Sequence, residues 1–374
     1  MRLRIIALCA VAVAMGAPLT APAQATTNTR TKFDVVNLVS DVSGKAAATD
    51  PKLVNPWGLA MGETLWVSNA GTGSATVYSG EGRKQQTEVW IPGGAPTGQV
   101  VNPGEGFTVK GKPATFLFAS PSGAITGWNA EVDPKNAIIG AFTRGADYKG
   151  LALAETDDGD FLLAADFAGG RIHAFDEDFE RVRLSRSAFR DRNVPRTYAP
   201  FNVEVINDNV WVAYALRDPE TGKSVAGAGK GFVSRFDLEG RLTGRISRVG
   251  LNAPWAIVKA PRGLGQYANS LLVGNFGDGT IQAYRNNRHL GALRDNNGRK
   301  IALPGLWDLE PGTATNGGAN SLWFSAGVDG GKHGLLGVIR PAGSRGSSPS
   351  TTTSPTHRPS HNPTKSSQSP YGGY

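Results

Sequence analysis

A repeated layout of short apolar segments most strongly constrains the fold of this chain. Each unit has an apolar segment, a second apolar segment and, after a glycine-rich turn, a third, as in LLVGNFGDGTIQAYR at 271–285. Branched and aromatic residues broken by glycines favour strands and tight turns. The second segments lie 46 to 61 residues apart and end at Asn69, Ser120, Asp166, Tyr214, Asn275 and Ala326. Units of about fifty residues with several strands are typical of propeller blades.

The repeat predicts an all-β, six-bladed β-propeller over residues 32–341, with a seven-bladed ring as the alternative. The segment FDVVNLVSD at 33–41 is a strand without a unit, and the last unit stops after its third strand at LLGVIRP. We therefore predict that the N-terminal strand closes the last blade. The first strands of the units are predicted in NPWGLAM (55–61), GEGFTV (104–109), YKGLALA (148–154), APFNVEV (199–205), APWAIVK (253–259) and GLWDLEP (305–311).

The two ends of the chain differ from the repeat in composition. Residues 1–25 combine Arg2 and Arg4, an apolar run and a small-residue cleavage site, which is the pattern of a secretory signal peptide. The single cysteine, Cys9, lies in this segment, so the mature protein would have no disulfide. Residues 342–374 are rich in Ser, Thr and Pro and are expected to be a disordered tail. We expect a secreted protein without a membrane span, with cell-wall association as an alternative.

The net charge of +8 is concentrated in the end segments. They hold five basic residues, which leaves 34 basic against 31 acidic residues, or +3, for the propeller region. A net charge this small does not indicate a nucleic-acid-binding protein. We expect a monomer whose partner is an extracellular ligand such as a glycan, a peptide or a small molecule.

Ordered motifs along the chain, among them NPWGLA, YKGLAL, LLVGNFGDG and HGLLGVIRP, resemble an uncharacterised family of secreted bacterial propeller proteins. This resemblance implies a six-bladed, NHL-like propeller and no established activity. A more distant likeness to the gluconolactonase and regucalcin propellers, carried by Glu105 in GEGF, implies metal-dependent lactonases. Where those enzymes have a metal-binding Asn, the other units have Trp57, Lys149, Phe201, Trp255 and Trp307. These side chains are not ligands for a divalent cation, so no metal site is predicted.

Six polar residues are the candidates for ligand binding: Asn69, Asp166, Asn202, Asn275, Asp308 and Glu105. The first two and Asn275 end second strands, where an Asx-type turn is the structural alternative. Asn202 and Asp308 occupy a position that is small in the other units, where a structural hydrogen bond is the alternative. The aromatic position beside them is expected to pack between blades.

No complete catalytic constellation is visible in the propeller region. It contains three scattered histidines, His173, His289 and His333, and no G-x-S-x-G motif. We therefore expect a non-catalytic propeller that binds its ligand at one rim of the central channel. The alternative is a metal-dependent lactonase- or lyase-like hydrolase that acts in the channel. No cofactor is predicted, and Ca²⁺ or another divalent cation stays open with that alternative.

Overall fold

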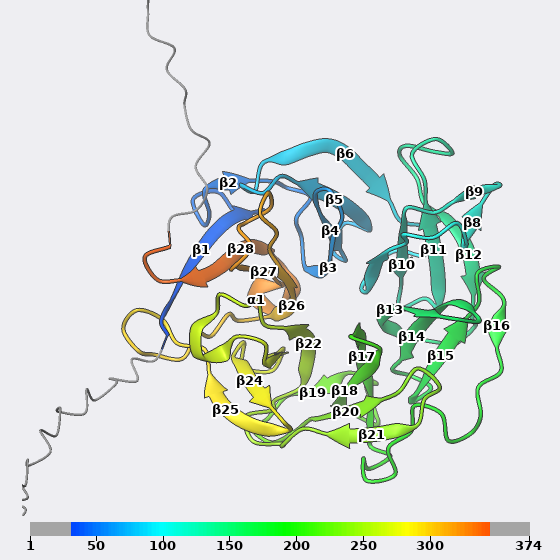
Figure 1. Ribbon diagram of the computed structural model, residues 1–374. Coiled ribbons are helices and arrows are strands. Elements are labelled where there is room, and N and C mark those ends of the chain that lie inside the picture. The colour runs from blue at the N-terminus through cyan, green and yellow to red at the C-terminus, as the bar shows by residue number, and fades with distance from the viewer. Residues whose placement is uncertain (1–30, 345–374) are drawn as a thin grey trace, which may run out of the picture. The chain divides into compact units, whose positions relative to one another are not determined.

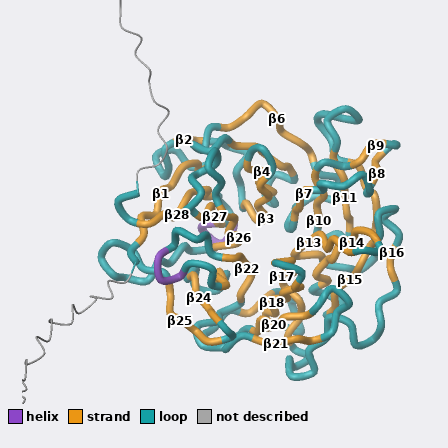
Figure 2. Tube along the Cα trace, in the orientation of Figure 1, coloured by secondary structure: helices purple, strands orange, loops and turns teal. Residues whose placement is uncertain are grey.

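The computed structural model describes residues 31–344, which form a six-bladed β-propeller (Figure 1). Strands dominate these residues (Figure 2), and their helices are η1 (Gly265–Tyr267) and the single turn α1 (Val328–Gly331). The predicted signal peptide and the tail beyond Ser344 lie outside the described residues. The predicted six-bladed ring is therefore confirmed.

Each blade has four antiparallel strands, and its first strand lies nearest the ring axis. Blade 1 contains β3 (Pro56–Met61), β4 (Leu65–Asn69), β5 (Ser74–Tyr78) and β6 (Lys84–Trp90). Blade 2 contains β7 (Gln99–Val101), β10 (Phe116–Ala119), β11 (Ala124–Trp128) and β12 (Ile138–Phe142), with the hairpin β8 (Thr108–Val109) and β9 (Lys112–Pro113). Blade 3 contains β13 (Tyr148–Thr156), β14 (Gly159–Asp166), β15 (Arg171–Phe175) and β16 (Arg181–Val182).

The remaining three blades complete the ring. Blade 4 contains β17 (Tyr198–Ile206), β18 (Asn209–Arg217), β20 (Phe232–Phe236) and β21 (Leu242–Arg245), with β19 (Ser224–Val225) paired to β18. Blade 5 contains β22 (Pro254–Lys259), β23 (Leu271–Asn275), β24 (Ile281–Arg285) and β25 (Arg288–Ala292). Blade 6 contains β26 (Leu306–Pro311), β27 (Leu322–Ala326), β28 (Leu335–Pro341) and β1 (Phe33–Ser40), with β2 (Ala48–Thr49) at its edge.

The ring closes by pairing the two ends of the propeller region. β1 runs antiparallel to β28, in a register from Phe33 opposite Pro341 to Ser40 opposite Leu335. Phe33 and Val39 on β1 are buried, each with 1% of its surface exposed. The prediction that the N-terminal strand completes the last blade is therefore confirmed. This pairing ties blade 6 to both ends of the described chain.

Blade 2 differs from the prediction in its inner strand. β7 lies within PTGQVV, whereas GEGFTV falls in the loop and the β8–β9 hairpin that follow. Asn102 folds this loop back, because its Nδ2 donates to the backbone oxygens of Gly106 and Ala114. Gln99 fixes β7 to blade 1 by donating from Nε2 to the backbone oxygens of Gly58 and Trp66. Placing Glu105 on an inner strand was therefore wrong.

Five of the six inner strands slip in register at the same point, beside the aromatic position of the repeat. Such bulges leave backbone groups without a partner in their own sheet. A neighbouring blade supplies the partner: the Gly58 amide donates to the Thr97 backbone oxygen at 2.8 Å, and the Thr97 hydroxyl donates to the Tyr148 backbone oxygen at 2.9 Å. The approach is close enough that a Cβ on Gly150 would lie 1.8 Å from Asn202 Oδ1. Glycine at positions such as Gly58 and Gly150 therefore permits neighbouring blades to approach this closely.

Candidate functional site

The three candidates that end second strands hold turns and connections together. Asp166 accepts from the Gly169 amide at 2.9 Å within its own turn and from the Asp147 amide at 3.1 Å. Asn275 accepts from the Asn252 amide and donates to the Gly250 backbone oxygen, so it fixes the loop that enters blade 5. Asn69 donates to Thr76 Oγ1 at 2.8 Å, and its Oδ1 is buried without a hydrogen bond. Each of the three has at most 3% of its surface exposed.

The two candidates on inner strands connect neighbouring blades at the bulges. Asn202 donates to the Trp255 backbone oxygen at 3.0 Å, from blade 4 to blade 5. Asp308 accepts from the Leu59 amide at 2.8 Å, from blade 6 to blade 1. Both side chains also line one cavity near the ring axis. Asn202 and Asp308 are the two candidates that the fold brings to a common site.

The remaining candidate, Glu105, is exposed in the loop between β7 and β8. No hydrogen bond or ion pair joins any two of the six candidates within residues 31–344. The same described region contains no group of three or more His, Asp or Glu placed to hold a metal ion. The candidate set therefore does not form a single constellation.

Aromatic side chains from three inner strands, together with Phe276 from the turn after β23, stack on one another near the ring axis. Trp57 and Trp307 are parallel with ring centroids 3.4 Å apart, and Phe276 stacks on Trp307 at 4.2 Å. Trp255 meets Trp57 and Trp307 edge-on, and the ammonium of Lys149 lies 5.5 Å from the Trp57 ring centroid. These contacts join blades 1, 5 and 6, so the aromatic position packs between blades as expected. This aromatic layer fills the axis on the side where the inner strands begin.

A cavity of about 320 Å³ lies beyond the aromatic layer, toward the ends of the inner strands. Its wall carries three carboxyl groups, from Glu204 on β17 and from Asp308 and Glu310 on β26. Glu204 and Glu310 make no side-chain hydrogen bond or ion pair with any described residue. We call this space the carboxyl cavity.

Burial controls the charge of the carboxyl cavity. Desolvation raises the pKa of Asp308 to about 7, against backbone hydrogen bonds from Leu59 and Leu309 that lower it. Desolvation, and then repulsion from Asp308, raises the pKa of Glu310 well above its ordinary value. Glu204 is affected in the same way, with repulsion from both other carboxyl groups. A carboxyl group that loses water disfavours its charged form, so all three groups hold their protons to a higher pH than exposed carboxyl groups do.

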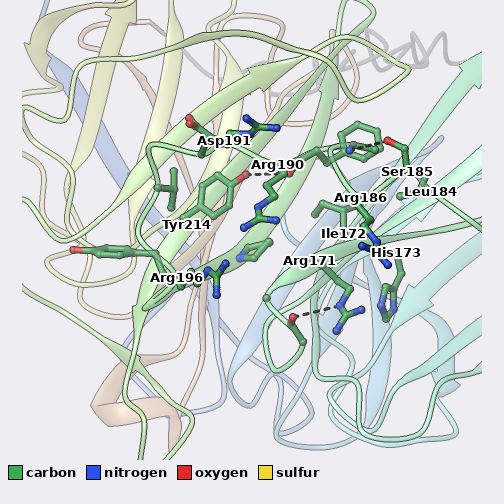
Figure 3. Close-up of a pocket in the computed structure, with 18 of the residues that line it drawn as sticks. Arg171, Ile172, His173, Leu184, Ser185, Arg186, Arg190, Asp191, Arg196 and Tyr214 are labelled. Carbon is green, nitrogen blue, oxygen red and sulfur yellow. Dashed lines mark hydrogen bonds between the residues drawn. The ribbon is translucent and has the colours of Figure 1, made fainter.

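A larger cavity, of about 1180 Å³, lies between blades 3 and 4. The segment 183–197, which joins β16 to β17, forms much of its wall. Figure 3 shows Arg171, Arg186, Arg190 and Arg196 around this space, with His173 and Tyr214 beside them. We call it the arginine cleft. Its eight arginines are Arg171, Arg181, Arg183, Arg186, Arg190, Arg192, Arg196 and Arg217.

The positive charge of the arginine cleft is not neutralised by the protein. None of the eight arginines forms an ion pair with a described carboxylate. Arg171 and Arg217 donate to backbone oxygens, and the side chains of the other six donate to no described group. Burial, together with the charge of Arg181, lowers the pKa of His173 to about 4. The cleft therefore keeps many guanidinium donors available.

Two buried residues hold the segment 183–197 in place. Phe189 is 4% exposed, packs against Phe236 at a centroid distance of 5.9 Å and has a φ of 52°. A left-handed conformation is costly for a bulky residue, so the surrounding contacts must enforce it. Asp191 is 4% exposed and binds both Arg245 and the Ser234 hydroxyl. Burial raises the pKa of Asp191, but the hydrogen bonds from Arg245 outweigh burial and hold this pKa below its usual value.

The sequence does contain a signal for the arginine cleft. Six arginines fall within RVRLSRSAFRDRNVPR at 181–196, against two acidic or amide residues, Asp191 and Asn193. Averaging charge over the whole propeller region conceals this local excess. Net charge near zero therefore says little about one face of a propeller.

Comparison with known proteins identifies relatives without a known function. No protein-family model matches the chain. The chain is 34% identical over 328 residues to uncharacterized protein R648 of Acanthamoeba polyphaga mimivirus, covering 83% of this chain and 80% of the viral protein. This chain belongs to the R648 family.

Two solved structures align with much of the length of this member of the R648 family. A streptogramin B lyase structure aligns with a TM-score of 0.47 and 11% identity, covering 83% of this chain and 97% of that chain. A putative gluconolactonase aligns with a TM-score of 0.41 and 16% identity, covering 66% and 88%. Similarity at this level assigns no function to the chain. No helix in residues 31–344 is long and apolar enough to cross a membrane.

Proposed function

We propose that this protein is an exported, non-catalytic propeller that binds an anionic ligand in the arginine cleft. The observation that carries the proposal is the set of six arginines whose side chains have no partner among the described residues. The ligand binds between blades 3 and 4, near the turn that contains Asp166. It does not bind around the axis, where the aromatic layer fills the space.

The chemistry of the cleft favours a ligand with several sulfate, phosphate or carboxylate groups. Arginine presents a planar fork of donors that bonds such anions bidentately. The cleft volume of about 1180 Å³ exceeds the usual range of small-molecule sites, about 300–1000 Å³. Phe189 and Asp191 hold the segment in place before a ligand arrives, which reduces the ordering cost of binding. An oligomeric polyanion meets these requirements.

Titration calorimetry with a sulfated oligosaccharide and with inorganic polyphosphate tests the proposal. The double variant Arg190→Ser/Arg196→Ser should bind about tenfold or more weakly, since charge-assisted hydrogen bonds contribute about 1.5–3 kcal/mol each. Arg262→Ser/Arg299→Ser removes the same charge from exposed side chains outside the cleft and should bind like the wild type. An equal loss in both variants, or no binding of either probe, would refute the proposal. Comparison of the two probes distinguishes a sulfated from a phosphorylated ligand.

Export follows from residues 1–25, which carry the pattern of a signal peptide. Fusing this segment to a reporter lacking its own signal should place the reporter outside the producing cell, with cleavage at the small-residue site. Retention of an uncleaved reporter in the cytoplasm would contradict export. Attachment to the cell wall through residues 342–374 predicts that deleting the tail releases the protein into the medium.

The carboxyl cavity supports a second candidate function, acid–base catalysis in the channel. Retained protons on clustered carboxyl groups are a property of catalytic acids, although ionic networks also perturb pKa values. A panel of lactone and ester hydrolysis and lyase substrates, assayed with and without Ca²⁺ or Mn²⁺, tests it. Turnover that Glu204→Gln and Glu310→Gln abolish would support catalysis. Absence of turnover under all conditions would leave binding as the function.

A further inference from the structure

A second groove lies on a different part of the ring, between blades 1 and 2. It encloses about 580 Å³ beside the outer strand β6. Trp90, at the end of β6, lines the groove with 54% of its surface exposed. Gln86, Thr87 and Glu88 line it from the same strand, and Asn136 lines it from blade 2. We call it the tryptophan groove.

The indole of Trp90 is exposed on a fixed backbone. The Trp90 amide donates to the Lys135 backbone oxygen at 2.8 Å, and the Trp90 backbone oxygen accepts from the Ala137 amide at 3.0 Å. The neighbouring side chains of Val89 and Ile91 are fully buried, which sets the outward direction of Trp90. The indole of Trp90 therefore loses little conformational freedom when a ligand binds to it. Exposing so large an apolar side chain to water is costly unless it serves binding.

The polar groups around the indole are suited to an uncharged ligand. Both oxygens of Glu88 are engaged by lysines, with Lys52 at 2.9 Å and Lys84 at 3.0 Å. Asn136 donates to the Asp133 carboxylate, which leaves its amide oxygen as an acceptor. The side chains of Gln86 and Thr87 form no hydrogen bond with a described residue. Lys135 is the one charged residue of the groove wall that forms no ion pair with a described residue, so the groove offers donors and acceptors with far less unpaired charge than the arginine cleft.

We propose that the tryptophan groove binds a neutral pyranose oligosaccharide, with one sugar ring stacked on Trp90. A pyranose has a face of C–H groups that packs on an indole and a rim of hydroxyl groups that exchange hydrogen bonds with Gln86, Thr87 and Asn136. The volume of about 580 Å³ lies within the range of small-ligand sites. This site is independent of the arginine cleft, which lies between other blades.

The test measures binding of three neutral probes, cellohexaose, maltohexaose and chitohexaose, to the full chain by tryptophan fluorescence and calorimetry. At least one probe should bind saturably and change the fluorescence, because Trp90 is an exposed indole. Trp90→Ala should weaken this binding about tenfold or more, as truncation of an aromatic anchor does. Trp90→Phe, which keeps an aromatic face, should recover part of the affinity.

Three further variants test whether the loss of sugar binding is specific to the tryptophan groove. Phe142→Ala removes an aromatic side chain that is 62% exposed and lies outside the groove, so it should bind like the wild type. Gln86→Ala, an exposed change within the groove, should weaken binding without altering the melting temperature. Arg190→Ser/Arg196→Ser should retain sugar binding, which keeps failure here distinct from failure at the arginine cleft. Binding of none of the probes, or equal loss in Trp90→Ala and Phe142→Ala, would overturn the proposal.

Discussion

Replacing Glu310 by Gln should make the stability of this protein less dependent on pH. In the folded protein, Asp308 has a pKa of about 7, and burial and mutual repulsion raise the pKa values of Glu204 and Glu310. When the chain unfolds, these carboxyl groups return to ordinary values near 4. Between about pH 5 and pH 7 the folded state therefore holds more protons than the unfolded state.

The sign and size of the effect follow from that difference in bound protons. Because unfolding releases protons in this range, the free energy of unfolding falls as the pH rises. A carboxyl group that is fully protonated in the folded state and ionised in the unfolded state contributes a slope of about 1.4 kcal/mol per pH unit, which is the upper limit for each of the three groups. Glutamine resembles the protonated acid and does not titrate. Glu310→Gln should reduce the slope by up to about 1.4 kcal/mol per pH unit and make the protein more stable than wild type at pH 7.

Urea unfolding followed by fluorescence at half-unit intervals from pH 5 to pH 7 measures these slopes. Glu63→Gln changes an exposed glutamate whose side chain forms no hydrogen bond or ion pair with a described residue, so its stability curve should run parallel to that of the wild type. A Glu310→Gln curve that is also parallel to the wild type would refute the assignment of retained protons to the carboxyl cavity.

Other predictions concern the aromatic layer, the blade contacts and the arginine cleft. Trp307→Ala removes a side chain that is 5% exposed and should lower the free energy of unfolding by about 3–5 kcal/mol. A smaller loss than that measured for Trp90→Ala, at an exposed tryptophan, would show that the aromatic layer does not stabilise the fold. Gly150→Ala should cost about 1–3 kcal/mol through its clash with Asn202, and less in an Asn202→Ala background if that contact is the cause. Asp191→Ala leaves Arg245 unpaired and should cost about 3 kcal/mol while increasing hydrogen exchange in 183–197, whereas unchanged exchange would show that Asp191 does not hold the segment.

The repeat predicted most of the fold because strand and turn chemistry is local. Second and third strands are visible in LLVGNFGDGTIQAYR, and the structure places β23 and β24 there with a turn between them. The unpaired strand at 33–41 and the truncated last unit together predicted the closure of β1 on β28. Blade 2 was misaligned because GEGF looks like the start of a unit, whereas β7 is only three residues long and contains the polar Gln99.

The candidate site was harder to predict because side-chain partners depend on contacts between blades. Asn202 and Asp308 were recognised as polar residues at a small position, but Glu204 and Glu310 were not, although they lie two residues further along the same inner strands. Alternation along a strand would have placed each pair on one face. The arginine cleft was missed because charge was averaged over the propeller, and its unpaired state depends on which carboxylates the fold brings near.

A crystal structure of the protein with a bound sulfated oligosaccharide or polyphosphate tests the central claim most directly. Density for the ligand should lie between blades 3 and 4, with sulfate or phosphate oxygens within hydrogen-bond distance of Arg190 and Arg196. Density confined to the carboxyl cavity or to the tryptophan groove, with the arginine cleft empty at saturating ligand, would contradict the account.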